Sequence, residues 1–246
     1  MYEKRYEGDC LEIMPTLLDK SIDMILCDLP YGATSNPKDI IIPFEPLWSE
    51  YRRLIKNTGI ICLTAMQPFS SMLVMSNMEM FKYDWIWEKP SDKGHFNAKK
   101  QPMRAHEHIL IFYNNQSTYN PQKTFGHVKK QAVKRKELNS VIYNNNTKDV
   151  EYNSTERYPR SVQIFKQDTQ QSSLHPNQKP VALFEYLIKT YSNEGDVILD
   201  NCAGSFTTAI AAINTNRKYI CIEKDPEYFR IGTERIKKHI ESLQVK

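Results

Sequence analysis

The sequence of 246 residues lacks the features of a disulfide-rich, zinc-stabilised or membrane-spanning protein. Its five cysteines stand singly, and no two of them form a Cys-x-x-Cys pair. Single cysteines in apolar or glycine-flanked segments are typical of reduced core residues, which argues against structural zinc and a disulfide framework. No apolar run approaches the about 18 residues of a membrane-spanning helix. The first residues also lack a signal-peptide pattern, so we expect a cytoplasmic protein with no membrane partner.

The length and composition are those of a globular protein with one large α/β domain and an insertion, or at most two small domains. The chain is 40% hydrophobic and 25% charged. Residues 89–166 hold fifteen Lys and Arg against six Asp and Glu, a net charge of +9, so the rest of a chain with a total of +4 carries −5. This asymmetry favours a polyanion-binding insertion in a mildly acidic body, with a solvated lysine-rich surface as the alternative.

Apolar runs alternate with turn signals along most of the chain. They predict strands at 22–28, 60–65, 83–88, 108–113, 196–200 and 218–223, and helices at 11–18, 43–55, 69–80, 181–191, 206–213 and 226–243. We expect Trp85 and Trp87 to face opposite sides of their strand, with one of them in the core. Residues 114–173 show no clear period, and about sixty such residues are too many for a connecting loop. The chain therefore divides into 1–113, an insertion at 114–173, and 174–246.

The segment Asp28-Leu29-Pro30-Tyr31 follows directly on an apolar run that predicts a buried parallel strand. Ligands of open α/β sheets bind at the carboxyl ends of such strands. A carboxylate and a proline-constrained backbone carbonyl suit the two N–H bonds of an exocyclic amine on a nucleobase, and an aromatic ring suits stacking on that base. An ordinary strand-to-loop turn capped by Asp28 is the alternative interpretation.

A second candidate site lies near the C-terminus. The small-residue turn 201–205 follows a predicted strand and precedes a helix, and the next strand ends in Glu223. This is the layout of a nucleotide-binding βαβ unit, in which a carboxylate at that strand end takes ribose hydroxyls. By itself, Glu223 would be an ordinary strand-end carboxylate. His106-Glu107-His108 lacks the four-residue spacing of a helical zinc site, so we predict no metal.

Taken together, four motifs resemble those of the DNA amino-methyltransferases that use S-adenosylmethionine, in the permuted β-type order. They are Asp28-Leu29-Pro30-Tyr31, His175-Pro176-Asn177-Gln178-Lys179-Pro180, Asp200-Asn201-Cys202-Ala203-Gly204-Ser205 and Glu223. The resemblance spans nearly the whole chain apart from the insertion. It implies a Rossmann-like methyltransferase fold with a mixed, mostly parallel sheet and a circularly permuted motif order. Residues 1–113 would be the catalytic half, 114–173 an inserted target-recognition subdomain, and 174–246 the cofactor-binding half.

The resemblance also implies roles for single residues. The catalytic residues would be Asp28, Pro30 and Tyr31. The cofactor residues would be Asp9 near the adenine, Lys179 and Pro180 near the methionine, Glu223 on the ribose, and Asp28, Asp200, Ala203, Gly204 and Ser205 around them. Two positions depart from the family pattern, which usually has proline at Leu29 and a second glycine at Phe206. A phenylalanine there adds bulk where the backbone approaches the cofactor closely.

We therefore expect transfer of a methyl group from S-adenosylmethionine to the N6 amino group of a flipped adenine in double-stranded DNA. Basic residues expected to bind DNA are Lys129, Lys130, Lys134, Arg135, Lys136, Arg157 and Arg160. Methylation of cytosine N4, of RNA or of a protein amide, a non-catalytic DNA-binding relative, and a nicotinamide-dependent oxidoreductase remain alternatives. The sequence also leaves open a homodimer and a cognate restriction endonuclease as partners. The resemblance implies that the protein is located in the cytoplasm of a bacterium and is encoded by a bacterial or phage gene.

Overall fold

The computed structural model describes residues 3–33, 39–132, 152–168 and 178–244. Backbone contacts divide the chain into two compact units. The larger unit consists of Met1–Asn120 and Ser161–Lys246, and the smaller one of Pro121–Arg160. Every described helix belongs to the larger unit.

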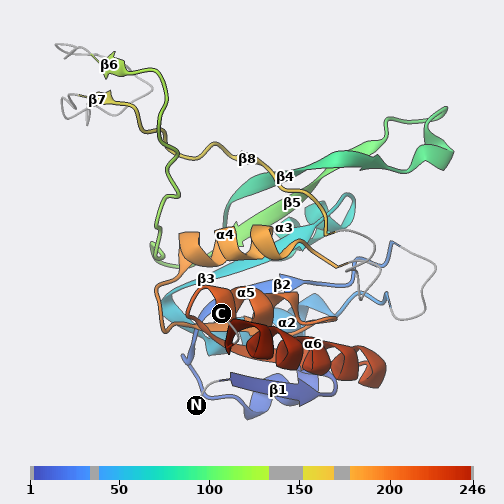
Figure 1. Ribbon diagram of the computed structural model, residues 1–246. Coiled ribbons are helices and arrows are strands. Elements are labelled where there is room, and N and C mark those ends of the chain that lie inside the picture. Colours follow the sequence, from blue (N-terminus) through green and yellow to red (C-terminus); the bar gives the residue numbers. More distant parts are fainter. Residues whose placement is uncertain (1–2, 34–38, 133–151, 169–177, 245–246) are drawn as a thin grey trace. The chain divides into compact units, whose positions relative to one another are not determined.

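The larger unit is built on one sheet with helices packed against it (Figure 1). The sheet has eight strands in the order β1-β10-β9-β2-β3-β5-β4-β8. Its strands are β1 (Glu3–Glu7), β2 (Ile22–Asp28), β3 (Ile55–Ala65), β4 (Phe81–Lys93), β5 (Arg104–Phe112), β8 (Val162–Ile164), β9 (Val197–Asp200) and β10 (Lys218–Glu223). Strand β5 runs antiparallel to both of its neighbours, and the other pairs in this sheet are parallel. The mixed, mostly parallel sheet confirms the predicted fold class.

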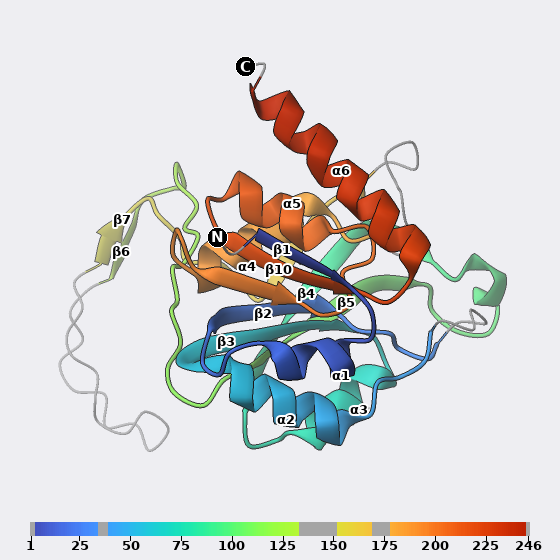
Figure 2. The same cartoon turned by 90° about the horizontal axis from the view of Figure 1, so that it is seen from below.

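Helices cover both faces of the sheet (Figure 2). One face carries α1 (Cys10–Ile13), the short 3-10 turn η1 (Met14–Thr16), α2 (Phe44–Leu54) and α3 (Phe69–Ser76), and the other carries α4 (Val181–Tyr191), α5 (Thr207–Asn214) and α6 (Pro226–Gln244). In β2, Ile25 and Cys27 pack into the first layer, whereas Met24 and Leu26 pack into the second. Central strands are therefore buried on both sides, which is why they are continuous apolar runs in the sequence.

The prediction for the two tryptophans of β4 is wrong. Trp85 and Trp87 are both buried, and both pack into the same hydrophobic layer as α4. Residues two positions apart on a strand point to the same face, so the alternation places the two rings together. Their indole N–H groups are satisfied inside this layer, Trp85 by the hydroxyl of Tyr191 at 2.5 Å and Trp87 by the carbonyl of Phe165 at 2.9 Å.

Two strands of the main sheet are missing from the sequence prediction. Strand β1 pairs with β10 at one edge, and β8 pairs with β4 at the other. The first is charged and mostly exposed, and the second has only three residues. Neither presents the apolar run by which the central strands were predicted, since edge strands bury less surface.

The smaller unit contains the antiparallel pair β6 (Lys130–Ala132) and β7 (Tyr152–Ser154) and an isolated bridge between Thr124 and Arg157. Its range, Pro121–Arg160, is narrower than the insertion expected at 114–173. At one end, the backbone N–H of Asn120 donates to the carbonyl of Thr190 in α4 at 2.7 Å. At the other end, β8 joins the main sheet. Both flanks thus belong to the larger unit.

Candidate active site

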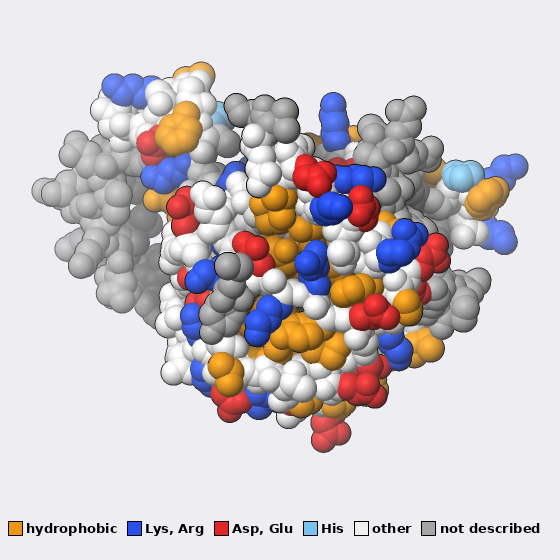
Figure 3. All heavy atoms as spheres, turned by 60° about the horizontal axis from the view of Figure 1, so that its bottom comes forward, with side chains coloured by type: hydrophobic (Ala, Val, Ile, Leu, Met, Phe, Trp, Pro, Cys, Tyr) orange, Lys and Arg blue, Asp and Glu red, His pale blue; other side chains and the backbone are white. Residues whose placement is uncertain are grey.

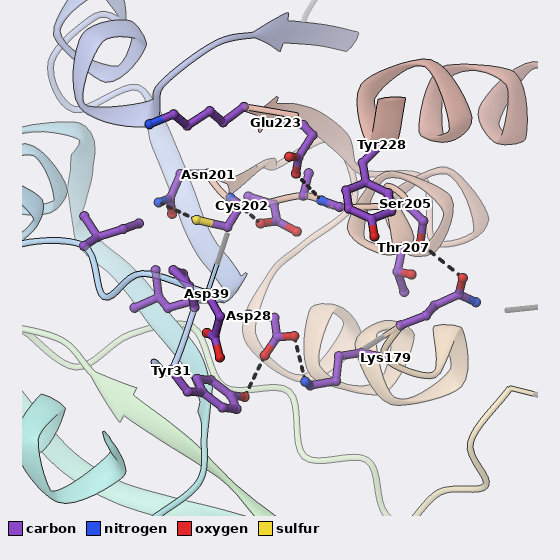
Figure 4. A pocket seen from close by; sticks show the side chains of 18 of the residues that line it. Asp28, Tyr31, Asp39, Lys179, Asn201, Cys202, Ser205, Thr207, Glu223 and Tyr228 are labelled. Carbon is purple, nitrogen blue, oxygen red and sulfur yellow. Dashed lines mark hydrogen bonds and ion pairs between the residues drawn. The ribbon is translucent and has the colours of Figure 1, made fainter. Parts of the chain in front are cut away.

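A cavity of about 1030 Å³ lies at the carboxyl ends of the central parallel strands (Figure 4). Three neighbouring strands, β10, β9 and β2, end in Glu223, Asp200 and Asp28. All three residues line the cavity. Because the carboxyl ends of parallel strands meet at one edge of a sheet, three carboxylates that are far apart in the sequence come together here.

The carboxylate of Asp28 accepts hydrogen bonds from three side chains. Its Oδ1 accepts from the hydroxyls of Tyr31, at 2.6 Å, and of Thr64. Its Oδ2 accepts from Nζ of Lys179 at 2.7 Å. Thr64 is fully buried in β3, directly beside Asp28 in the parallel register. A carboxylate has about four acceptor positions, so the contacts among the described residues leave one position on Oδ2.

Lys179 is the centre of a buried, charge-balanced cluster. It is 7% exposed, and its ammonium lies between Asp28 and Glu107, whose Oε2 is 3.3 Å away. Glu107 also pairs with Lys89 of the adjacent strand. Burial acts to lower the pKa of Lys179, but the two carboxylates outweigh it and raise the pKa, so the ammonium stays charged. The pKa of Glu107 is lowered, because the two lysines outweigh the effect of its burial.

The turn after β2 is fixed by a ring contact and a backbone hydrogen bond. The ring of Tyr31 stacks on that of Phe69, with centroids 5.2 Å apart and an interplanar angle of 28°. Gly32 has a φ of 64°, in the left-handed region that favours glycine, and its N–H donates to Asp39 at 2.9 Å. Burial raises the pKa of Tyr31, so its hydroxyl keeps its proton and remains a hydrogen-bond donor.

The small-residue turn after β9 is tied to the neighbouring strand. Asp200 accepts the N–H of Cys202 at 3.1 Å and the hydroxyl of Thr208. Glu223 reaches across from the end of β10, and its Oε2 accepts the N–H of Gly204 at 2.7 Å. Burial raises the pKa of both carboxyl groups, to about 7 for Asp200. The ends of β9 and β10 therefore bring two acidic side chains to this turn in a partly desolvated setting.

Phe206 does not add bulk to the cavity, contrary to the expectation from sequence. Its backbone has a φ of 60°, the conformation that glycine adopts without strain. The side chain is fully buried and contacts Phe229 at a centroid distance of 5.7 Å and Gly232 of α6. It is not among the residues that line the cavity. The bulk lies instead in the layer between α5 and α6.

Most of the predicted catalytic and cofactor residues line the cavity. Those that do are Asp9, Asp28, Pro30, Tyr31, Lys179, Asp200, Ala203, Gly204, Ser205 and Glu223. Asp9 caps α1 by accepting the N–H of Leu11 at 2.9 Å and pairs with Lys224 at 2.9 Å. The hydroxyl of Ser205 donates to Gln178 at 3.1 Å. Pro180 is buried immediately before α4 and is not part of the lining. Residues 175–177 of the motif before α4 lie outside the described residues.

The basic residues proposed for DNA lie in the smaller unit, and their surroundings differ. Lys129, Lys130 and Arg160 are exposed. The guanidinium of Arg157 donates to backbone carbonyls of Ser154, Glu156 and Val128, so it braces the unit itself. Lys134, Arg135 and Lys136 lie outside the described residues. On the face shown in Figure 3, Lys and Arg side chains are interspersed with Asp and Glu.

Sequence reasoning missed Thr64 and the Glu107–Lys89 pair. Thr64 is the last residue but one of a strand that was predicted, so its place near the carboxyl edge was a usable signal. Glu107 contacts Lys179 only because β5 enters the sheet antiparallel beside β3, a register that no local pattern specifies. Among the described residues, no group of three His, Cys, Asp or Glu is arranged to hold a metal ion. Within the same residues, no helix has the length and apolarity to cross a membrane.

Comparison with known proteins agrees with this site. The profile of the family described as DNA methylase matches residues 22–234. The DNA adenine methyltransferase YhdJ of Escherichia coli (strain K12) is 30% identical over 245 residues, which cover 93% of this chain and 81% of YhdJ. The type II methyltransferase M.HpaI of Haemophilus parainfluenzae is 27% identical, over 93% of this chain and 72% of its own. The chain therefore belongs to the DNA methylase family.

Solved structures support the fold. The crystal structure of the M1.HpyAVI–SAM complex has a TM-score of 0.66 and 24% identity, and the match covers 95% of this chain and 98% of that one. PvuII DNA methyltransferase, described as cytosine-N4-specific, also has a TM-score of 0.66, with 17% identity over 94% of this chain and 85% of its own. The Rossmann-like methyltransferase fold expected from the sequence is thereby confirmed.

Proposed function

We propose that the protein is a DNA methyltransferase that transfers a methyl group from S-adenosylmethionine to the N6 amino group of adenine in double-stranded DNA. The observation that carries this proposal is the cavity in which the Asp28 turn faces the small-residue turn and Glu223. The adenine in the names of relatives such as YhdJ supports the choice of base. The resemblance supports it too, since an Asp at the head of this motif mostly accompanies adenine.

The residues at the end of β10 fit the cofactor. S-adenosylmethionine supplies an electrophilic methyl group on a sulfonium. Glu223 accepts one backbone N–H on each oxygen, from Gly204 at 2.7 Å and from Asp225 at 2.8 Å. Each oxygen keeps a further acceptor position, which suits the two hydroxyls of a ribose. We assign the ribose to Glu223 and the adenine end of the cofactor to the neighbourhood of Asp9.

Asp28 would activate the amine by orientation. An exocyclic amine is a poor nucleophile, because its lone pair is delocalised into the ring. The free position on Oδ2 of Asp28 accepts one amino hydrogen, and we assign the other to the carbonyl of Pro30. These two bonds direct the lone pair toward the methyl group, and holding the reactants together removes much of the entropic cost.

The contacts around Asp28 suit a hydrogen-bond acceptor. Nζ of Lys179 pairs with Oδ2 at 2.7 Å, and the hydroxyls of Tyr31 and Thr64 donate to Oδ1. The amine would keep both protons until its lone pair forms the N–C bond to the methyl group, while the bond from that methyl group to the sulfonium sulfur breaks and leaves a neutral thioether. The nitrogen is then cationic and acidic, and its extra proton leaves along the hydrogen bond to Asp28. No covalent bond to the protein is required.

The target base must leave the helix to reach this cavity, at a cost of a few kcal/mol. We propose that stacking on Tyr31 offsets part of this cost and that the smaller unit, Pro121–Arg160, carries target recognition.

Such an enzyme acts in the cytoplasm, where bacterial DNA lies. A cognate restriction endonuclease is a reasonable partner hypothesis, because relatives such as M.HpaI carry type II names. A homodimer is the second partner hypothesis, and light scattering at working concentration tests it.

The proposal is tested by identifying the modified base. The protein is incubated with bacterial DNA that lacks adenine methylation and with methyl-labelled S-adenosylmethionine, and the DNA is digested to nucleosides. We expect the label in N6-methyl-2′-deoxyadenosine, and sequencing of the same DNA maps the methylated site. Label only in N4-methyl-2′-deoxycytidine would change the assigned base. No label in DNA, with label in RNA or protein, would overturn the proposal.

A further inference from the structure

Lys179 has hydrogen-bonding capacity beyond the contacts that hold it. An ammonium has three N–H donors. One donates to Oδ2 of Asp28, and a second is directed at most to Glu107, at 3.3 Å. Within the described part of the chain, its remaining contact is with the ring of Tyr31, whose centroid is 5.5 Å away, and this contact uses the charge rather than a hydrogen bond. At least one N–H therefore remains for a ligand.

This donor lies directly beside the acceptor of Asp28. Both side chains line the cavity, and their heads meet at 2.7 Å (Figure 4). The pair thus presents a donor and an acceptor side by side. In adenine, the N6 amine is a donor and the adjacent ring nitrogen N1 is an acceptor, so the two edges are complementary. In guanine, N1 beside the amine carries a hydrogen, so two donors would face each other on that side, and the acceptor N3 lies on the other side of the amine.

We propose that Lys179 is a substrate-contacting residue, which donates a hydrogen bond to N1 of the flipped adenine while Asp28 accepts one from the N6 amine. The inference rests on the proposed function and deepens it. It moves Lys179 from the methionine end of the cofactor, where the resemblance would put it, to the target base. The contact selects bases that present an acceptor beside the amine.

Glu107 helps to hold the ammonium of Lys179 where it can contact the base. Without Glu107, Asp28 would be the lysine's single carboxylate partner among the described residues. Glu107 supplies a second carboxylate on the other side, and Oε2 of Glu107 is itself buried without a hydrogen bond of good geometry. Lys89 in turn balances Glu107. The ammonium is therefore fixed in place before the base arrives, which reduces the entropy lost on binding.

The test uses base analogues in the duplex site mapped for the parent enzyme. In 1-deazaadenine the N1 acceptor is replaced by C–H and the amine is kept, whereas 3-deazaadenine keeps N1 and serves as the matched control. Single-turnover methylation is measured for the parent and for Lys179→Met with adenine and with each analogue. We expect the parent to lose at least about ten-fold on 1-deazaadenine, the size of a charged hydrogen bond. On adenine, the single-turnover rate of Lys179→Met should be lower than that of the parent by a similar factor. Changing the substrate to 1-deazaadenine should lower the rate of this variant little further.

The pattern of losses separates a base contact from a role through Asp28. The inference is overturned if the rate of Lys179→Met on 1-deazaadenine is reduced by the product of the two separate losses. The analogue and the substitution would then act independently, so Lys179 would not contact N1. A loss of cofactor affinity in Lys179→Met, measured by calorimetry, would return the residue to the cofactor and also overturn it. If Lys179→Met does not fold, the parent alone carries the test, and equal rates on 1-deazaadenine and 3-deazaadenine would overturn the inference. Failure of the parent to methylate unmodified duplex would refute the proposed function instead.

Discussion

Phe206 shows how one residue can depart from a family pattern without filling the site. Its left-handed backbone costs about 1–2 kcal/mol for a residue with a Cβ. Complete burial of the ring more than offsets this cost, because removing a buried phenylalanine side chain typically costs about 3–5 kcal/mol. Gly232 provides the space, since a Cβ there would lie 2.6 Å from the Phe206 ring. The two residues form a matched pair.

This pairing predicts a non-additive double mutant. Phe206→Gly should lower the free energy of unfolding by about 1–4 kcal/mol, the packing energy of the ring minus the relieved strain. Gly232→Ala should cost about 1–3 kcal/mol in the parent through overpacking, and much less in Phe206→Gly. Urea denaturation measures all four proteins, and equal costs in both backgrounds would contradict the pairing. Calorimetry should show no tighter cofactor binding in Phe206→Gly.

Single residues of the site were predictable where they follow an apolar run. Asp28, Asp200 and Glu223 each end a buried strand, so sequence placed them at one edge of the sheet. The partners of Asp28 could not be predicted in the same way. Thr64 and Glu107 reach it through strand register, which is set by the packing of the whole sheet rather than by a local pattern.

At the scale of elements, the strands and helices that bury most of their apolar residues could be predicted from the sequence, and the exposed edge strands could not. Strand β10 and helix α4 have the predicted bounds, because both bury most of their apolar residues. Strands β1 and β8 lie at the edges and bury little. In the smaller unit, β6 and β7 have three residues each, too few for a period to be detected. The prediction therefore treated this whole region as irregular.

The smaller unit gives a prediction about DNA affinity. Lys129 and Lys130 are exposed next to and on β6, so their ammonium groups can reach phosphates. Replacing both with Gln should weaken DNA binding and reduce the slope of log affinity against log salt by about 0.9 for each phosphate that is no longer neutralised. Replacing Lys237 and Lys238, two exposed lysines of α6, is the matched control. Equal slopes in both double variants would show that the β6 lysines are only a solvated surface.

At the scale of the whole molecule, buried Asp200 couples stability to pH. Burial raises its pKa from 3.8 to about 7 in the folded protein. The folded state therefore holds a proton that the unfolded state has released, so the contribution to stability is full below about pH 4 and disappears as the pH rises through 7. Asp200→Asn removes this contribution. Between pH 5 and 8, the parent should lose about 1–3 kcal/mol of unfolding free energy relative to the variant. Parallel pH profiles would contradict the raised pKa.

The central claim is that Asp28 orients the amine and leaves the cofactor to other residues. Its most direct test is the single-turnover rate of methyl transfer by Asp28→Ala, at saturating DNA and S-adenosylmethionine, with folding checked by thermal denaturation. The account predicts a rate at least about 100-fold below that of the parent, because the hydrogen bond from the amine to Asp28 acts in the transition state. Cofactor affinity should change little. A folded Asp28→Ala protein that methylates DNA at the parent rate would contradict the account.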